Sequence, residues 1–487
     1  MRTLSCLVIG IVVVAVASAC SRPTGVSAAA EAMGATTLNS IQYSGSGSHY
    51  AFGQAYAPGE RWPRFEAKTY AVAVDYQAPA MRLEMLRAQA ERPPRGGGAQ
   101  PFAREQRTVT VVNGTHAWTE GPQAAAPTPA AVSDRLRQVW LTPHGVIKAA
   151  VASGAAANGN VMTLTIEDRE VTATLNGENL VERVEYLATN SVVGDVPVEI
   201  TYSDYADFGG VQFPRRIVEK WDGFETIDIT VSDVQPNAAV SLPVPENVAQ
   251  APAPPPLPSV SVEKVADGVW SLHVPNTRSL AVEFSDHIVV LEGPTSEARS
   301  IAVNQEIRKA IPGKPIRYVV NTHAHYDHAG GLRTYVAEGA TVITHEGNQA
   351  FYEQAWARPR TIEPDMLAKS PRPAMIEAVV DRRVLADGAR TVELYSLENF
   401  GHNGATLIAY LPKERIVLYG DGYNPPAGPD PRDPSRTLEY AQQIYENIQR
   451  LKLNPARIAA VHGRAVVPFE NLRMAIGVTP VPANVTN

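Results

Sequence analysis

The sequence predicts two folded regions, an N-terminal domain of mostly antiparallel β-sheet and a C-terminal domain in which strands and helices alternate. Two-residue alternation of β-branched and aromatic residues dominates from about residue 39 to 238. Strand-like and helix-like stretches alternate from residue 259 onward, which is typical of layered folds. Between them, residues 243–258 contain seven prolines and favour an extended, semi-rigid linker.

Composition indicates a globular protein with no nucleic-acid partner, and the partner we expect is a small-molecule substrate. The chain has 487 residues, a net charge of -7 and 44% hydrophobic residues. An acidic balance of this kind does not attract nucleic acid. Beyond the N-terminus we find no run of 18 apolar residues, so we expect no internal membrane span. The oligomeric state is left open.

Residues 1–20 are typical of a signal peptide, with a basic start and an apolar core over residues 7–17. Ala17 and Ala19 suit ordinary signal peptidase. Ser18-Ala19-Cys20 resembles a bacterial lipobox, although Ala17 replaces the usual Leu. We favour the lipoprotein, in which Cys20 carries lipid and attaches the protein to the outer membrane. Both forms of processing predict export to the periplasm.

Cysteine usage excludes a disulfide framework in the mature chain. The two cysteines are Cys6 and Cys20, and Cys6 leaves with the signal peptide. Any metal site must therefore use histidine and carboxylate ligands.

The N-terminal domain, residues 21–242, is expected to form one large curved sheet. The helical segment over residues 134–152 predicts one or two helices against one face of that sheet. Residues 92–101 and 122–129 are low in complexity and predict flexible loops. Residues 113–118 and 202–214 resemble bacterial envelope lipoprotein carriers. That resemblance implies an apolar ligand, and the alternative is a purely structural accessory domain. We expect His49, His116 and His144 to be structural.

In the C-terminal domain, residues 259–487, the most informative stretch places His323, His325, Asp327 and His328 within six residues. An apolar strand, residues 316–320, precedes it, and Gly330-Gly331 follows. So many polar side chains on one tight loop would each need a partner in a core. Imidazole and carboxylate groups are instead the usual ligands of zinc, and also of iron and manganese.

Three later residues extend this pattern, each at the end of a predicted strand: His402 after Gly401, Asp421 after residues 416–419, and His462 after residues 458–461. Together with the first four, they resemble the signature of the metallo-β-lactamase-fold superfamily over residues 259–480. The resemblance implies an αββα fold, two mixed sheets back to back with helices outside.

The resemblance also implies a dinuclear centre and a hydrolytic reaction. His323, His325 and His402 would hold one divalent ion, while Asp327, His328 and His462 would hold a second. Asp421 would bridge them. Zinc is expected, with iron or manganese open. A hydroxide shared by the ions would attack an ester, thioester, lactone or amide carbonyl, and Asp327 would orient it and carry its proton.

Neighbouring residues are candidates for substrate contact or support of the ligands, with local packing as the alternative. These are His345, Tyr326, Asn403, Tyr423 and Arg464. Two other functions stay open: an iron-dependent oxygenase on the same fold, and an envelope ligand-binding lipoprotein with an accessory metal domain.

Overall fold

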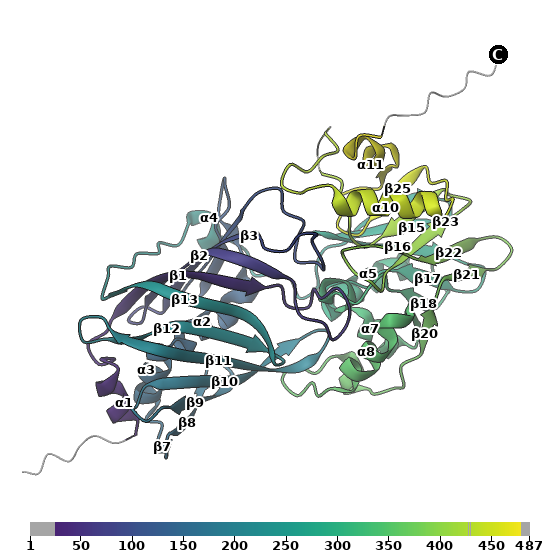
Figure 1. Cartoon of the computed structure of the whole chain (residues 1–487). Helices are drawn as coiled ribbons and strands as arrows, with labels where there is room; N and C mark the ends of the chain where they lie inside the picture. The colour runs from purple at the N-terminus through teal and green to yellow at the C-terminus, as the bar shows by residue number, and fades with distance from the viewer. Residues whose placement is uncertain (1–24, 427, 429, 479–487) are drawn as a thin grey trace, which may run out of the picture.

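The structure, a computed structural model, describes residues 25–426, 428 and 430–478 (Figure 1). The predicted signal peptide and Cys20 lie outside the described residues. Within the described part of the chain, no helix is both long and apolar enough to cross a membrane.

The N-terminal half is one antiparallel sheet of 13 strands in the order β6-β5-β4-β3-β2-β1-β13-β12-β11-β10-β9-β8-β7. The chain therefore runs outward along one arm of the sheet and returns along the other, and the first strand pairs with the last. The strands are β1 (Ser40–Tyr50), β2 (Arg64–Asp75), β3 (Ala80–Gln89), β4 (Gln106–Asn113), β5 (His116–Thr119), β6 (Ala126–Pro127), β7 (Ala157–Asn158), β8 (Val161–Ile166), β9 (Arg169–Leu175), β10 (Val181–Asn190), β11 (Gly194–Asp207), β12 (Gln212–Trp221) and β13 (Phe224–Pro236). The predicted antiparallel sheet is confirmed.

Helices cover one face of this sheet: α1 (Val26–Ala32), α2 (Val132–Leu141) and α3 (Pro143–Ser153). Alternation explains the arrangement, because strand β8 buries Met162, Leu164 and Ile166 while the threonines between them are exposed. The predicted helical segment forms two of these helices, α2 and α3. Thr142 caps α3 by accepting a hydrogen bond from Gly145 N, and Pro143 occupies its first turn.

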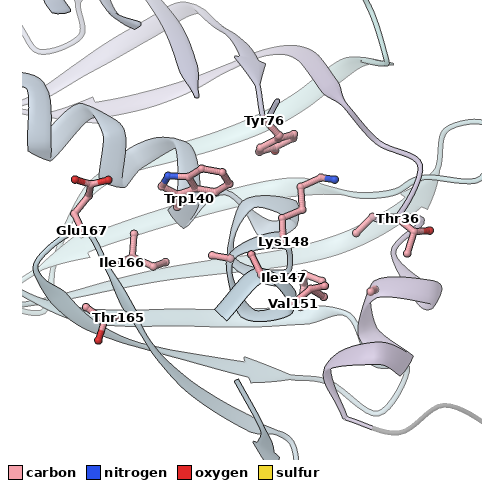
Figure 2. A pocket seen from close by; sticks show the side chains of 13 residues that line it. Thr36, Tyr76, Trp140, Ile147, Lys148, Val151, Thr165, Ile166 and Glu167 are labelled. Carbon is pink, nitrogen blue, oxygen red and sulfur yellow. The ribbon is translucent and has the colours of Figure 1, made fainter. Parts of the chain in front are cut away.

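A cavity of about 560 Å³ opens between these helices and the sheet (Figure 2). Tyr76, Trp140, Ile147 and Ile166 give it an apolar lining, and Lys148 lies among them. Binding of an apolar ligand by the N-terminal half stays a prediction.

The C-terminal half has four layers, as predicted. One sheet has the order β14-β15-β16-β17-β18-β19-β20 and the other has the order β21-β22-β23-β24-β25-β26. Their facing sides share a core that includes Leu291, Val320, Leu407 and Leu418. The strands are β14 (Ser261–Ala266), β15 (Val269–Val274), β16 (Thr277–Glu283), β17 (Ile288–Leu291), β18 (Ile316–Val320), β19 (Thr341–His345), β20 (Ile376–Val379), β21 (Arg382–Ala386), β22 (Thr391–Ser396), β23 (Leu407–Leu411), β24 (Ile416–Tyr419), β25 (Arg457–Ala460) and β26 (Val467–Pro468).

Helices form the outer layers. Those against the first sheet are α5 (Glu297–Ala310), α6 (Tyr326–Ala329), α7 (Leu332–Glu338), α8 (Glu346–Ala357) and α9 (Met366–Lys369), and those against the second are α10 (Glu439–Arg450) and α11 (Glu470–Ala475). Strands β17 to β20 run parallel, as do β24 and β25. Loops that leave the carboxyl ends of these strands therefore gather at one edge.

The two halves share a packed interface. The turn between β10 and β11 places Val192 and Val193 in the C-terminal core. Arg358 forms an ion pair with Asp222 at 2.5 Å. The Pro-rich stretch contains a short helix, α4 (Glu246–Ala249), which packs on strands β4 and β5. Figure 1 shows the loops after β1 and β3 projecting from the N-terminal sheet towards the C-terminal half.

Candidate metal centre

The loop after β18 carries four of the predicted ligands and is held by Asn321. The Asn321 carboxamide donates to the carbonyl oxygen of His323 at 2.8 Å and accepts from the Tyr352 hydroxyl at 2.7 Å. Asn321 is fully buried. Because the chain leaves a parallel strand and soon enters α6, these ligands lie at the carboxyl end of β18.

The first group of donor atoms belongs to His323, His325, His402 and Asp421, and all of these atoms lie within 4.8 Å of one another. His323 Nε2 lies 3.3 Å from His402 Nε2. His402 Nε2 lies 3.0 Å from Asp421 Oδ2. All four residues are buried.

The second group belongs to Asp327, His328, His462 and again Asp421. His328 Nε2 lies 3.0 Å from both His462 Nε2 and Asp421 Oδ2. His462 Nε2 is 3.3 Å from Asp327 Oδ2. The structure thus brings together the seven side chains that the sequence selected, and Asp421 belongs to both groups.

These donor atoms fit divalent metal ions. Ligands of a tetrahedral zinc ion, each about 2.0–2.1 Å from the metal, lie about 3.3 Å apart. The two nitrogen pairs above are 3.3 Å and 3.0 Å apart, which is close to that spacing. Moreover, His325 belongs to the first group, and its Nδ1 is buried with no hydrogen-bond partner among the described residues. A bound cation would satisfy it, whereas a purely structural histidine would leave it unpaired at a cost.

In three of the histidines, His325, His328 and His462, the nitrogen that does not face a ligand group is engaged, which fixes the tautomer. His328 Nδ1 donates to Glu292 Oε2 at 2.7 Å, and His462 Nδ1 donates to the Asn276 carbonyl at 2.9 Å. His325 Nε2 donates to the Ala55 carbonyl at 2.8 Å. Each bond leaves the other nitrogen free to bind metal, as the outer partners of metal-ligating histidines do.

The pKa values of the candidate ligands favour binding of a cation. Burial lowers the pKa of His323 well below its ordinary value and that of His325 to about 3, so both are neutral ligands. Burial opposes ionisation of Asp421, but His402 and His462 outweigh it and hold its pKa well below the usual range. Burial likewise disfavours His328 as a cation, yet Glu292 and Asp327 raise its pKa. The centre therefore concentrates negative charge that a divalent ion would neutralise.

The other candidate residues lie outside both groups. His345 caps α8 by accepting from Gly347 N, and its Nε2 lies 2.9 Å from Ser396 Oγ. Tyr423 donates to the Pro431 carbonyl. Asn403 donates to the Ala55 carbonyl and also caps its own loop at Ala405 N.

Tyr326 packs edge-on against Phe52, in an aromatic group between the two halves. Arg464 is exposed beside His462. Local packing thus accounts for Tyr326, and among the described residues Arg464 makes no hydrogen bond or ion pair with a metal ligand.

One wall of the centre comes from the N-terminal half, which the sequence did not predict. Gln54, in the loop after β1, donates to Asp327 Oδ1 at 2.7 Å. The loop predicted to be flexible, residues 92–101, packs over the same place, and Gly96 N donates to the Gly401 carbonyl. A Cβ on Gly97 would lie 2.0 Å from Gln54 Oε1 and 2.8 Å from His325 Cε1. Three consecutive glycines were the one signal of this close approach.

Comparison with known proteins gives a family match in the C-terminal half. Residues 291–462, less than half of the chain, match the family model described as the metallo-beta-lactamase superfamily. A curated relative, 2,4-dinitroanisole O-demethylase subunit alpha from Nocardioides sp. (strain JS1661), is 25% identical over 89 residues. That match covers 18% of this chain and 27% of the relative.

Solved structures similar to this chain include metallo-beta-lactamases from Pontibacter korlensis and Hirschia baltica. The first is 17% identical, with a TM-score of 0.34, and covers 45% of this chain and 98% of its own. The second is 16% identical, with a TM-score of 0.33, and its match covers 44% of this chain and 94% of its own. We base the assignment on the family match and on the layered fold, because these TM-scores lie below 0.5. Residues 291–462 thus form a metallo-beta-lactamase superfamily domain, and the seven side chains of the metal centre all lie within it.

Proposed function

We propose that the C-terminal domain is a hydrolase that works with two divalent metal ions, and that zinc is the resident ion. The observation that supports this most is the position of Asp421. Its Oδ2 lies 3.0 Å from both His402 Nε2 and His328 Nε2, which belong to different donor groups. A carboxylate shared in this way suits two ions side by side rather than one.

When bound, two such ions acidify a water molecule and polarise the bond that is attacked. The chain's own residues supply positioning and proton transfer. Asp327 Oδ2 faces the second group and its side chain is 38% exposed, against 0% for His328. Asp327 is therefore placed to orient an attacking water and to accept its proton. His462 is the other partly exposed ligand, so substrate approaches from the side of Asp327 and His462.

The substrate class that we propose is a carbonyl compound: an ester, thioester, lactone or amide. The structural relatives are metallo-beta-lactamases by name, and the curated relative is named as acting on 2,4-dinitroanisole. β-Lactams and electron-poor aryl ethers therefore belong in any substrate panel beside esters and thioesters.

Metal analysis of the purified mature protein, combined with turnover of that panel, tests the function. We expect about two zinc ions per chain, turnover of at least one carbonyl substrate, and loss of turnover with a chelator that is reversed by zinc. Turnover that persists after complete metal removal would refute the proposal.

We also propose that the protein is exported and anchored by lipid at Cys20. Labelling of cells with a fatty-acid analogue should mark the wild-type protein and leave Cys20→Ser unmarked. Equal recovery of both proteins in the cytoplasm would refute export.

A further inference from the structure

The loop between β1 and β2, residues 51–63, is joined to both sides of the metal centre. Gly53 O accepts from the backbone N–H of Tyr326, and Tyr56 O accepts from that of Gly404. These partners adjoin Asp327 on one side and His402 on the other. The loop therefore spans the two segments that supply ligands.

Aromatic packing holds this loop against the C-terminal half. The ring centroid of Phe52 lies 5.2 Å from that of Tyr326 in the C-terminal half and 5.1 Å from that of Trp221 in β12 of its own half. Contacts of this kind add to the apolar area that is buried. The loop thus forms one wall of the metal centre.

The carboxamide of Gln54 has a fixed direction. Its Oε1 accepts from Gly98 N at 2.9 Å, and only the oxygen of a carboxamide can accept. Its Nε2 must then point the other way, where it donates to Asp327 Oδ1 at 2.7 Å. The bond between the two halves therefore has a defined donor and a defined acceptor.

This bond separates the roles of the two oxygens of Asp327. Oδ1 is occupied by Gln54, whereas Oδ2 lies 3.3 Å from His462 Nε2 and 3.8 Å from His328 Nε2. With Oδ1 held, the carboxylate offers a single oxygen to the second donor group. An unrestrained carboxylate could rotate and offer either or both.

We propose that Gln54 of the N-terminal half is a positioning residue of the metal centre, which directs Asp327 Oδ2 towards the second ion. This inference rests on the proposed dinuclear site. It assigns to the N-terminal half a part in building that site.

Substitution Gln54→Met tests the inference because it keeps the length of the side chain and removes both hydrogen bonds. The readouts are the affinities of the two sites for Zn²⁺, measured by chelator competition, and the visible spectrum of the Co²⁺-loaded protein. We expect affinity at one site to fall about 10- to 100-fold, with a changed Co²⁺ spectrum, while the other site is unaffected.

Gln235→Met is the matched control. Gln235 Nε2 also donates to a carboxylate, that of Asp233, at 2.9 Å. This bond is exposed and lies near the C-terminal end of β13. It should leave both affinities and the spectrum unchanged. Circular dichroism confirms that each variant is folded.

A second variant, Gln54→Glu, keeps an acceptor for Gly98 N and replaces only the donor. It should weaken the same site at least as much as Gln54→Met, because two carboxylates then face each other. Wild-type affinities and spectra in both variants would overturn the inference while leaving the dinuclear site intact. Failure of the wild-type protein to bind two ions would instead overturn the proposed function.

Discussion

The two walls of the metal centre differ in the kind of groups they use. The C-terminal wall consists of imidazoles and carboxylates at strand ends, such as His323, His402 and Asp421. The N-terminal wall offers the carboxamide of Gln54 and the carbonyl of Ala55. They form hydrogen bonds with Asp327 Oδ1 and His325 Nε2. One wall therefore supplies the donor atoms and the other restrains them. The predictions below separate these contributions.

Asp421→Asn removes the bridging charge from the C-terminal wall and should have the largest effect. We expect kcat/KM for the best substrate to fall by on the order of 10³ or more, and metal content to fall to about one ion per chain or less. Asp430→Asn is the control, because that aspartate is exposed and pairs with Arg432. An Asp421→Asn protein with two ions and wild-type turnover would contradict the bridging role.

Glu292→Gln changes a fully buried group behind the ligands but within the C-terminal domain. The carboxylate accepts from Thr322 N and from His328 Nδ1, so loss of its charge should loosen His328. Affinity for zinc should fall about 10- to 100-fold in chelator competition. Glu446→Gln, on an exposed position of α10, should have wild-type affinity. Equal affinities in the two variants would show that Glu292 does not support the metal ligands.

His144 is a buried histidine of the N-terminal half with no metal-binding neighbour among the described residues. Its Nε2 donates to the Met33 carbonyl, and burial lowers its pKa to about 4. The unfolded chain, with a pKa of about 6.5, binds more protons between these values. His144 therefore contributes full stability above about pH 6.5 and loses it as pH falls towards 4.

Relative to His144→Gln, the wild-type free energy of unfolding should fall by about 2 kcal/mol between pH 7 and pH 5. Urea titrations of both proteins with chelator present measure this difference. Parallel pH profiles would show that His144 is not buried in its neutral form.

Gly97→Ala disturbs the N-terminal wall and should have the smallest effect, because no ligand is removed. The added methyl group would meet Gln54 Oε1 and the ring of His325, so the loop must shift outward. Zinc affinity should fall about tenfold. Gly177→Ala is the control, because nothing lies within 4 Å of its Cβ position. Identical affinities would show that this loop does not restrain the ligands.

The same contrast explains what the sequence could predict. Residues such as His328 and His462 are rare types at the ends of apolar strands, and their chemistry limits their roles. Ala55 acts through a carbonyl that any residue would supply, and Gln54 acts through a common polar side chain in a loop. Neither position carries a compositional signal, because their effect arises from packing between segments about 270 residues apart.

Secondary structure was likewise predictable only where the pattern of side chains along the chain determines it. Residue alternation predicted the antiparallel sheet, and the alternation of strands and helices predicted a layered fold. The four layers were implied by the resemblance to the metallo-β-lactamase-fold superfamily. The helical pattern over residues 134–152 did not reveal that Thr142 and Pro143 end one helix and begin another. The low complexity of residues 92–101 suggested flexibility, whereas its glycines permit close packing on Gly401 and His325.

Anomalous X-ray diffraction from crystals of the zinc-loaded full chain tests the central claim most directly. We predict two anomalous peaks, about 3.5–4 Å apart, with Asp421 between them, Ala55 O on His325 and Gln54 on Asp327. A single peak, or two peaks with residues 51–63 displaced from both ligands, would contradict a dinuclear centre built by the two halves of the chain.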